Sequence, residues 1–332
     1  MTRRSVWSKA EIQALLEQFV PVADEVGRLQ RGKDVECRTF QEFAEQGHYK
    51  GRTQPSNTRQ GIYAVAPSGK FLASCNTRHA HVVARMLRRA LHRWQELEAS
   101  ERHLPAARIA ELGKTKRWID GYPEDGLVLR ITTRDLPRTS GDRASRPRDW
   151  RARAWNLDYA WFKKSEAKQF VPPKPKVGAR RAVPQPLIRR LVRLNLLDNV
   201  RGQVPPFGEH DVQTARLIAT VDRVEGDIVR LKLTGATRAV RKGRWRIQGF
   251  SDRPTQQEIG LETRLLGHAA FDRKRAQFVE FDLVAVGKRW GGTQFNARGD
   301  DLAASPIGAV LQLASGARNE RIAPARIWDY HW

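Results

Sequence analysis

The sequence predicts an α+β protein in which a small α/β domain precedes a larger antiparallel β domain. One observation is the order strand, turn, strand, helix within residues 60–94, where two short apolar runs flank Pro67–Gly69 and a basic amphipathic helix follows. Another is the change to two-residue periodicity after Thr214, which is typical of strands with one buried face. The expected domains are 1–98 (the small α/β domain), 99–185 (a basic, Trp-rich connector) and 186–332 (a helix plus an antiparallel β domain).

The first domain begins with a helix signal. Ser8 and Glu11 have the spacing of a capping box, in which the hydroxyl and the carboxylate satisfy free amides of the first turn. Phe19–Ala23 has the pattern of a short buried strand. After the hairpin, the predicted helix Ala80–Leu97 carries one apolar stripe and a largely basic remainder. These elements need a second layer to cover the sheet.

The order of these elements resembles the thioredoxin-like fold. W-S-x-x-E begins a helix, FVPVADEV follows, and QGIYAVAPSGKFLAS precedes the last helix. In that family W-C-x-x-C begins the equivalent helix, so Ser8 and Glu11 stand at the positions of its two cysteines. The resemblance therefore implies a degenerate scaffold without a redox centre over residues 5–98. The whole chain is loosely similar to uncharacterised bacterial proteins that pair such a domain with a β-rich one.

The connector is basic and rich in aromatic residues. Arg134–Arg181 contains fourteen Lys and Arg against five Asp and Glu, a balance that favours a surface for phosphates. The interleaved aromatic residues are Trp150, Trp155, Tyr159, Trp161 and Phe162. Such rings stack on bases, although rings that anchor a loop onto a domain give the same composition. The proline-rich stretch 171–186 predicts an extended linker.

The β domain begins with an amphipathic helix predicted over Leu187–Val200. Five strands with hairpin turns follow, and Leu127–Thr132 adds one in the connector. The five are Ala215–Asp222, Asp227–Thr234, Glu262–Phe271, Gln277–Val286 and Ile307–Ala314. Five or more antiparallel strands predict a sandwich or a small barrel.

The net charge of +24 predicts attraction to nucleic acid, another polyanion or an acidic protein. A compositional preference for Arg would give the same charge without any such partner. No run approaches the ~18 apolar residues of a membrane span, and the first residues lack the apolar core of a signal peptide. We therefore expect a cytoplasmic protein, unless a leader precedes Met1. The oligomeric state is not predicted.

Familiar catalytic motifs are absent. The sequence has no Walker A, G-x-G-x-x-G, H-E-x-x-H or C-x-x-C pattern, so it predicts no cofactor, metal site or catalytic residue. Cys37 and Cys75 are candidate redox thiols, with buried inert thiols as the alternative. Glycines around Lys288–Trp290 predict a loop whose amides could bind an anion, or an ordinary hairpin loop.

These observations favour a non-catalytic binding or scaffold protein that engages an acidic partner through a basic aromatic surface. The candidate anion- or nucleic-acid-binding residues are Arg151, Arg153, Trp155, Trp161, Lys163, Lys164, Lys288, Arg289 and Trp290. The alternatives are a thiol redox protein that uses Cys37 or Cys75, and an enzyme that uses the loops of the β domain.

Overall fold

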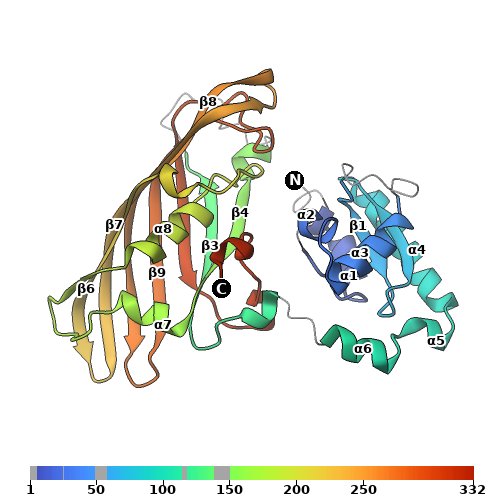
Figure 1. Cartoon of the computed structure of the whole chain (residues 1–332), viewed down its shortest axis with the longest axis horizontal. Helices are drawn as coiled ribbons and strands as arrows, with labels where there is room; N and C mark the ends of the chain where they lie inside the picture. Colours follow the sequence, from blue (N-terminus) through green and yellow to red (C-terminus); the bar gives the residue numbers. More distant parts are fainter. Residues whose placement is uncertain (1–5, 25, 49–57, 114–117, 138–149) are drawn as a thin grey trace. The chain divides into compact units, whose positions relative to one another are not determined.

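The computed structural model describes residues 6–24, 26–48, 58–113, 118–137 and 150–332 (Figure 1). It forms two compact units, Met1–Arg117 and Trp118–Trp332, which we call the N-terminal and C-terminal units. The sequence predicted boundaries at 98 and 185 instead. The difference arises because three strands of the sheet of the C-terminal unit, β3, β4 and β5, come from the expected connector. Among the described residues, no helix is both long and apolar enough to cross a membrane.

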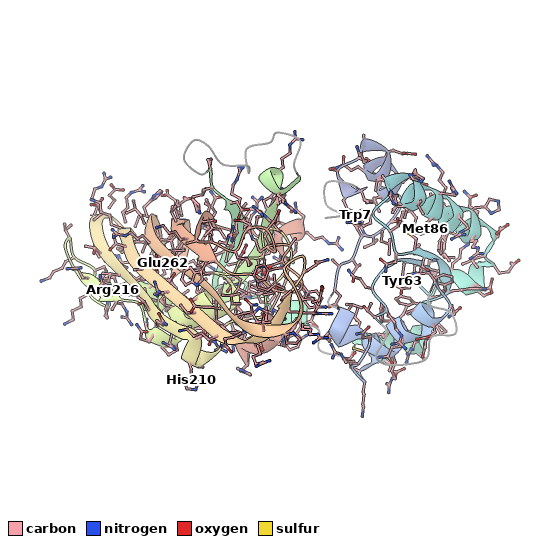
Figure 2. All side chains as sticks on the ribbon, turned by 90° about the horizontal axis from the view of Figure 1, so that it is seen from above. Trp7, Tyr63, Met86, His210, Arg216 and Glu262 are labelled. Carbon is pink, nitrogen blue, oxygen red and sulfur yellow. The ribbon has the colours of Figure 1, made fainter. Side chains whose placement is uncertain are left out.

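The N-terminal unit contains a two-stranded antiparallel sheet, β1 (Ile62–Val65) and β2 (Phe71–Cys75), as the sequence predicts. Helix α4 (Ala80–Glu96) packs on it through a buried stripe that includes Val83 and Leu87. Tyr63 of β1 packs against Phe40 and Phe43 of α3; Tyr63, Trp7 and Met86 are labelled in Figure 2. The other helices are α1 (Ala10–Leu16), α2 (Val26–Leu29), α3 (Val35–Glu45), α5 (Ala99–Arg102) and α6 (Ala106–Gly113).

Two predicted features of this unit are wrong. Helix α1 follows Lys9 and has no side-chain cap, because Glu11 forms an ion pair with Arg88 of α4 rather than a capping box. Phe19–Ala23 forms no strand, and Val20 and Val22 are each 85% exposed, so this run pairs with neither strand of the sheet. The described part of the unit therefore carries a sheet of two strands only.

The C-terminal unit contains one antiparallel sheet of eight strands in the order β4-β3-β10-β9-β8-β7-β6-β5. The prediction of an antiparallel β domain is confirmed, and the sheet is a single curled half-barrel (Figure 1). Its strands are β3 (Leu127–Asp135), β4 (Trp155–Phe162), β5 (Arg180–Ala182), β6 (Val212–Glu225), β7 (Ile228–Ile247), β8 (Ser251–Asp272), β9 (Gln277–Trp290) and β10 (Ser305–Leu313).

The concave side of the sheet, which we call the inner face, holds the core. Helix α8 (Gln185–Leu194) lies there and buries Leu187, Ile188 and Leu191 against the strands (Figure 1). Glycines allow the curl, because a Cβ at Gly267 or Gly287 would meet a carbonyl oxygen of the neighbouring strand. Short elements complete the unit: α7 (Lys164–Ala167), η2 (Trp118–Gly121), η4 (Trp150–Arg153), η5 (Lys168–Phe170), η6 (Glu209–Asp211), η7 (Arg318–Glu320) and η8 (Ile327–Tyr330).

Side chains cover the free edge of β4, which would otherwise offer unpaired backbone groups. Asn195 donates to the Tyr159 carbonyl at 2.9 Å and Arg190 donates to the Trp161 carbonyl at 3.1 Å. The Trp161 amide donates to the Tyr330 hydroxyl at 3.3 Å. The aromatic run predicted as an open binding surface is thus an edge strand covered by α8 and the last residues of the chain. The predicted linker 171–186 is also ordered, since it forms β5 and buries Val183.

Candidate functional site

A line of cross-strand partners crosses the outer, convex face of the curled sheet from β6 to β4. The partners, in order, are Arg216, Ala236, Arg264, Val286, Gly308, Arg134 and Trp155. Residues directly opposite each other in antiparallel strands project from the same face of a sheet, and the leucines next to Arg216 and Arg264 are buried on the inner face. We call Arg216, Arg264 and Arg134 the outer arginine row. Arg216 is labelled on the sheet in Figure 2.

The three arginines of the outer arginine row are exposed. Several other basic residues of this face form ion pairs, as Lys232 does with Asp222 at 2.6 Å and Arg230 with Glu280 at 3.1 Å. No ion pair to the three row arginines occurs within the described ranges of the chain. With strands ~4.8 Å apart, Arg264 lies roughly 10 Å from Arg216 and roughly 14 Å from Arg134. The row therefore suits a ligand with several negative charges in line.

An apolar band runs beside the row. The next line of cross-strand partners contains Ile218, Thr234, Leu266, Val284, Val310 and Thr132. Leu266 is 69% exposed, and Val284 and Val310 are partly exposed. Exposed apolar side chains in a continuous strip, next to charges, are typical of binding surfaces.

Trp290 marks the end of the outer face where β9 stops. Its ring lies against the backbone at Gly260, and its indole nitrogen donates to Glu258 at 2.7 Å. The guanidinium of Arg238 lies 5.3 Å from the ring centroid, within cation–π range. Lys288 is exposed on the same face. The arrangement fixes the orientation of the indole beside several cations.

Five of the nine predicted binding residues are associated with this end of the sheet. Trp155, Lys288 and Trp290 project from the outer face, and Trp155 is the cross-strand partner of Arg134. Arg151 and Arg153 lie in η4, just before β4, where Arg153 is exposed and Arg151 forms an ion pair with Asp300.

The other four predicted residues are either buried or at the opposite end of the sheet. Trp161 has no exposed surface and Arg289 is 1% exposed, so neither is available to a ligand. Lys163 and Lys164 follow the opposite end of β4, about 25 Å of strand away from Trp155. There Lys163 lies 4.9 Å from the ring centroid of Trp332 and Lys164 forms an ion pair with Asp125 at 3.2 Å.

Arg289 belongs to a buried ionic network that sequence reasoning missed. Arg298 contacts Asp135 at 2.8 Å and Asp198 at 2.6 Å, while Arg201 contacts Asp135 at 2.8 Å. The members are Arg201, Arg289, Arg298, Asp135, Asp198 and Asp301, so three cations meet three anions. The network ties the loop between β9 and β10 to the end of β3 and to the segment after α8. No local motif signals it, because its members come from distant parts of the chain.

Electrostatics in this network favour the ionised form of Asp135. Burial alone would raise the pKa of the Asp135 carboxyl. The hydrogen bond and charge of Arg298, together with the charge of Arg201, outweigh burial and hold that pKa below its ordinary value. Because the charges balance within the cluster, it is suited to holding the loop in place rather than to binding an external ion.

The two thiols are free, and their surroundings disfavour the thiolate. Cys37 is fully buried in α3, and burial and a hydrogen bond to Asp34 raise the pKa of its thiol to about 11. Burial also raises the pKa of Cys75. Within the described residues, no cluster of His, Cys, Asp and Glu could hold a metal ion. These observations give the redox alternative no support.

Two cavities in the described part of the C-terminal unit are too small for a substrate. One is lined in part by Phe207 and Trp290 and the other by Leu196 and Ile307, and each has a volume of about 10 Å³, room for about one water molecule. Small-molecule sites usually need roughly 300 Å³ or more. Chemistry in these two cavities is therefore excluded, and the open outer face is the stronger candidate. Comparison with known proteins adds no family assignment, because no protein-family model, curated protein or solved structure matches the chain.

Proposed function

We propose that this protein is a non-catalytic binding protein whose C-terminal unit binds nucleic acid on the outer face of its curled sheet. The observation that carries the proposal is the outer arginine row, which presents three guanidinium groups in line that form no ion pair with any described residue. Guanidinium groups bind phosphates strongly, often through two parallel hydrogen bonds. A small anion would reach only one of these arginines, whereas a phosphodiester chain can reach all three.

The neighbouring groups add the contacts that a nucleic acid needs besides charge. Trp155 is the last residue of the line, beside Arg134, and is 37% exposed, so its side chain can contribute an apolar contact to the sugars next to the bound phosphates. Leu266 and the valines of the apolar band lie beside the phosphate-binding groups and can contact sugars. The net charge of +24 would speed association at low salt. For residues 1–98, the degenerate thioredoxin-like scaffold stays a prediction.

The test is the binding of a fluorescently labelled oligonucleotide to the full chain at several salt concentrations. For the double variant Arg134→Ala/Arg264→Ala, we expect weaker binding and a slope of log K against log salt that is shallower by roughly two units. The control variant Lys274→Ala/Arg275→Ala removes the same charge at the exposed turn between β8 and β9, and it should leave the slope nearly unchanged. Absence of binding at low salt, or equal effects of both variants, would overturn the proposal and favour an acidic protein as the partner.

A further inference from the structure

The two longest strands continue past the neighbouring strands as a two-stranded ribbon. β7 pairs with β6 only up to Ala239, and β8 pairs with β9 only from Gly260 onward. Beyond these points β7 and β8 pair only with each other, up to the turn at residues 248–250. We call residues 240–259 the β7–β8 ribbon, which reaches beyond the neighbouring strands at the top of Figure 1. Its length is roughly 25 Å.

One side of the ribbon is basic. Lys242, Arg244 and Arg246 alternate along β7, which places them at intervals of roughly 6.6 Å, close to the spacing of neighbouring phosphates on a strand. Lys242 is 71% exposed on its side chain, and Arg244 and Arg246 are also exposed. Gln256 is the cross-strand partner of Arg244, and Phe250 projects at the turn with 60% exposure. Glu258, opposite Lys242 at 3.5 Å, is the one carboxylate that pairs with these cations in the described structure.

The opposite side of the ribbon packs against the rest of the C-terminal unit. Trp245 donates from its indole nitrogen to the Gly292 carbonyl at 2.8 Å, and Ile247 is buried beneath the turn. Arg241 forms an ion pair with Asp211 at 2.9 Å at the base of the ribbon. The loop that receives Trp245 is the loop held by the buried ionic network. A ribbon supported in this way needs little ordering when it binds, which lowers the entropic cost of binding.

From these observations we propose that the β7–β8 ribbon enters the major groove of double-stranded DNA. This inference rests on the proposed function and specifies its ligand. The major groove of B-form DNA is about 12 Å wide and admits a two-stranded β-ribbon. The deep, narrow major groove of an RNA duplex does not admit one.

The side chains on the basic side of the ribbon have two roles, contact with phosphates and contact with bases. Lys242 lies near the sheet, on the same face as the outer arginine row, so it and the row contact phosphates on the flank of the groove. Arg244, Arg246 and Gln256 stand farther out, where they reach base edges. Arginine pairs with guanine and glutamine with adenine through two hydrogen bonds in this groove. The ribbon therefore gives some preference for base sequence, and the row gives affinity.

The experiment compares the full chain on three labelled probes of one mixed sequence: duplex DNA, duplex RNA and single-stranded DNA. We expect duplex DNA to bind at least tenfold more tightly than duplex RNA. Arg244→Ala/Arg246→Ala should weaken duplex-DNA binding by roughly ten- to a hundredfold and remove that preference. A dye that occupies the major groove should compete with the wild type, and one that occupies the minor groove should not.

The matched control is Arg273→Ala/Arg275→Ala at the turn between β8 and β9, which removes two exposed arginines at the other end of the same strands. If this control weakens duplex binding as much as the ribbon variant does, or if the duplex RNA binds equally well, the ribbon inference is overturned while the proposed function stands. If no probe binds, both are overturned.

Discussion

At the scale of single residues, charge pairing divides the arginines of the C-terminal unit into two classes. Arg298 has no exposed side-chain surface and contacts Asp135, Asp198 and Asp301. Burial of an unpaired charge costs several kcal/mol of folding free energy, so the ion pairs of Arg298 are needed for stability and its charge is not available to a ligand. Arg264 is exposed and has no ion pair in the part of the chain that is described, so its charge remains available to a ligand. Substitutions should therefore separate stability from binding.

Asp135→Asn should destabilise the C-terminal unit strongly. It removes the carboxylate that Arg298 and Arg201 share and leaves two buried guanidinium groups with fewer partners. We expect a loss of roughly 3–5 kcal/mol in the free energy of unfolding at pH 7, measured by urea denaturation. Arg264→Ala is the control and should change stability by less than about 0.5 kcal/mol. A small loss for Asp135→Asn would mean that the network relaxes or takes up water.

The same variant has a predicted pH dependence. The pKa of Asp135 lies below its ordinary value in the folded protein, because Arg298 and Arg201 outweigh burial. Its stabilisation is therefore complete above the unfolded-state pKa of about 3.9 and is lost as the pH falls through the folded-state value. The stability difference between wild type and Asp135→Asn should shrink below pH ~4. A difference that stays constant down to pH 3 would contradict this assignment.

Cys37 should react slowly in the native protein. With a pKa of about 11, only about one thiol in a thousand is ionised at pH 8. In the variant Cys75→Ser, a disulfide reagent should modify Cys37 at least a hundredfold more slowly before than after unfolding in urea. Cys37→Ser should leave nucleic-acid binding unchanged. Rapid native reaction of Cys37 would restore the redox alternative.

At the scale of elements, periodicity predicted the strands that have one buried and one exposed face. β6 and β9 are of this kind, and the predicted runs lie within them. Periodicity did not predict β4, because the last residues of the chain cover its outer side. Tyr159 and Trp161 are therefore as buried as Ala160 and Phe162, and no alternation of apolar and polar residues results. Periodicity did not predict the β7–β8 ribbon either. The apolar pattern ends after Thr234 because basic side chains follow, although β7 continues.

The curl of the sheet depends on close strand contacts at glycines. A Cβ at Gly287 would meet the carbonyl oxygen of Glu262 on the neighbouring strand, so Gly287→Ala must push β8 and β9 apart. We expect a loss of roughly 1–3 kcal/mol, the usual cost of overpacking, measured as a lower unfolding midpoint. Gly121→Ala, in the same unit, is the matched control, because nothing lies within 4 Å of the added atom. Equal midpoints for the two variants would show that the strands adjust without cost.

At the scale of the whole molecule, composition predicted a basic binding protein but not where its charged residues lie on the surface. Trp155, Lys288 and Trp290 were predicted from local sequence and do share the outer face. The outer arginine row was not predicted, because Arg134, Arg216 and Arg264 are far apart in the chain and only strand register brings them into line. Trp161 and Arg289 were chosen by residue type alone, and tertiary packing buried both.

The two compact units have separate cores, which predicts two unfolding transitions. The N-terminal core gathers around α4 and a two-stranded sheet, whereas the C-terminal core spans the eight-stranded sheet and α8. Leu87 and Leu283 lie in these two cores, and each is at most 3% exposed. Truncation of either to alanine removes buried methyl groups and should cost about 2–5 kcal/mol in its own unit only.

Calorimetry of the full chain tests this separation. Leu87→Ala should lower one transition and leave the other in place, and Leu283→Ala should do the reverse. The smaller core buries less apolar surface, so the transition that Leu87→Ala moves should be the one at lower temperature. Nucleic acid should raise only the transition that Leu283→Ala moves, because binding stabilises the unit that holds the site. A single transition that both variants lower together would mean that the two units unfold cooperatively. Stabilisation by nucleic acid could then not be assigned to the C-terminal unit.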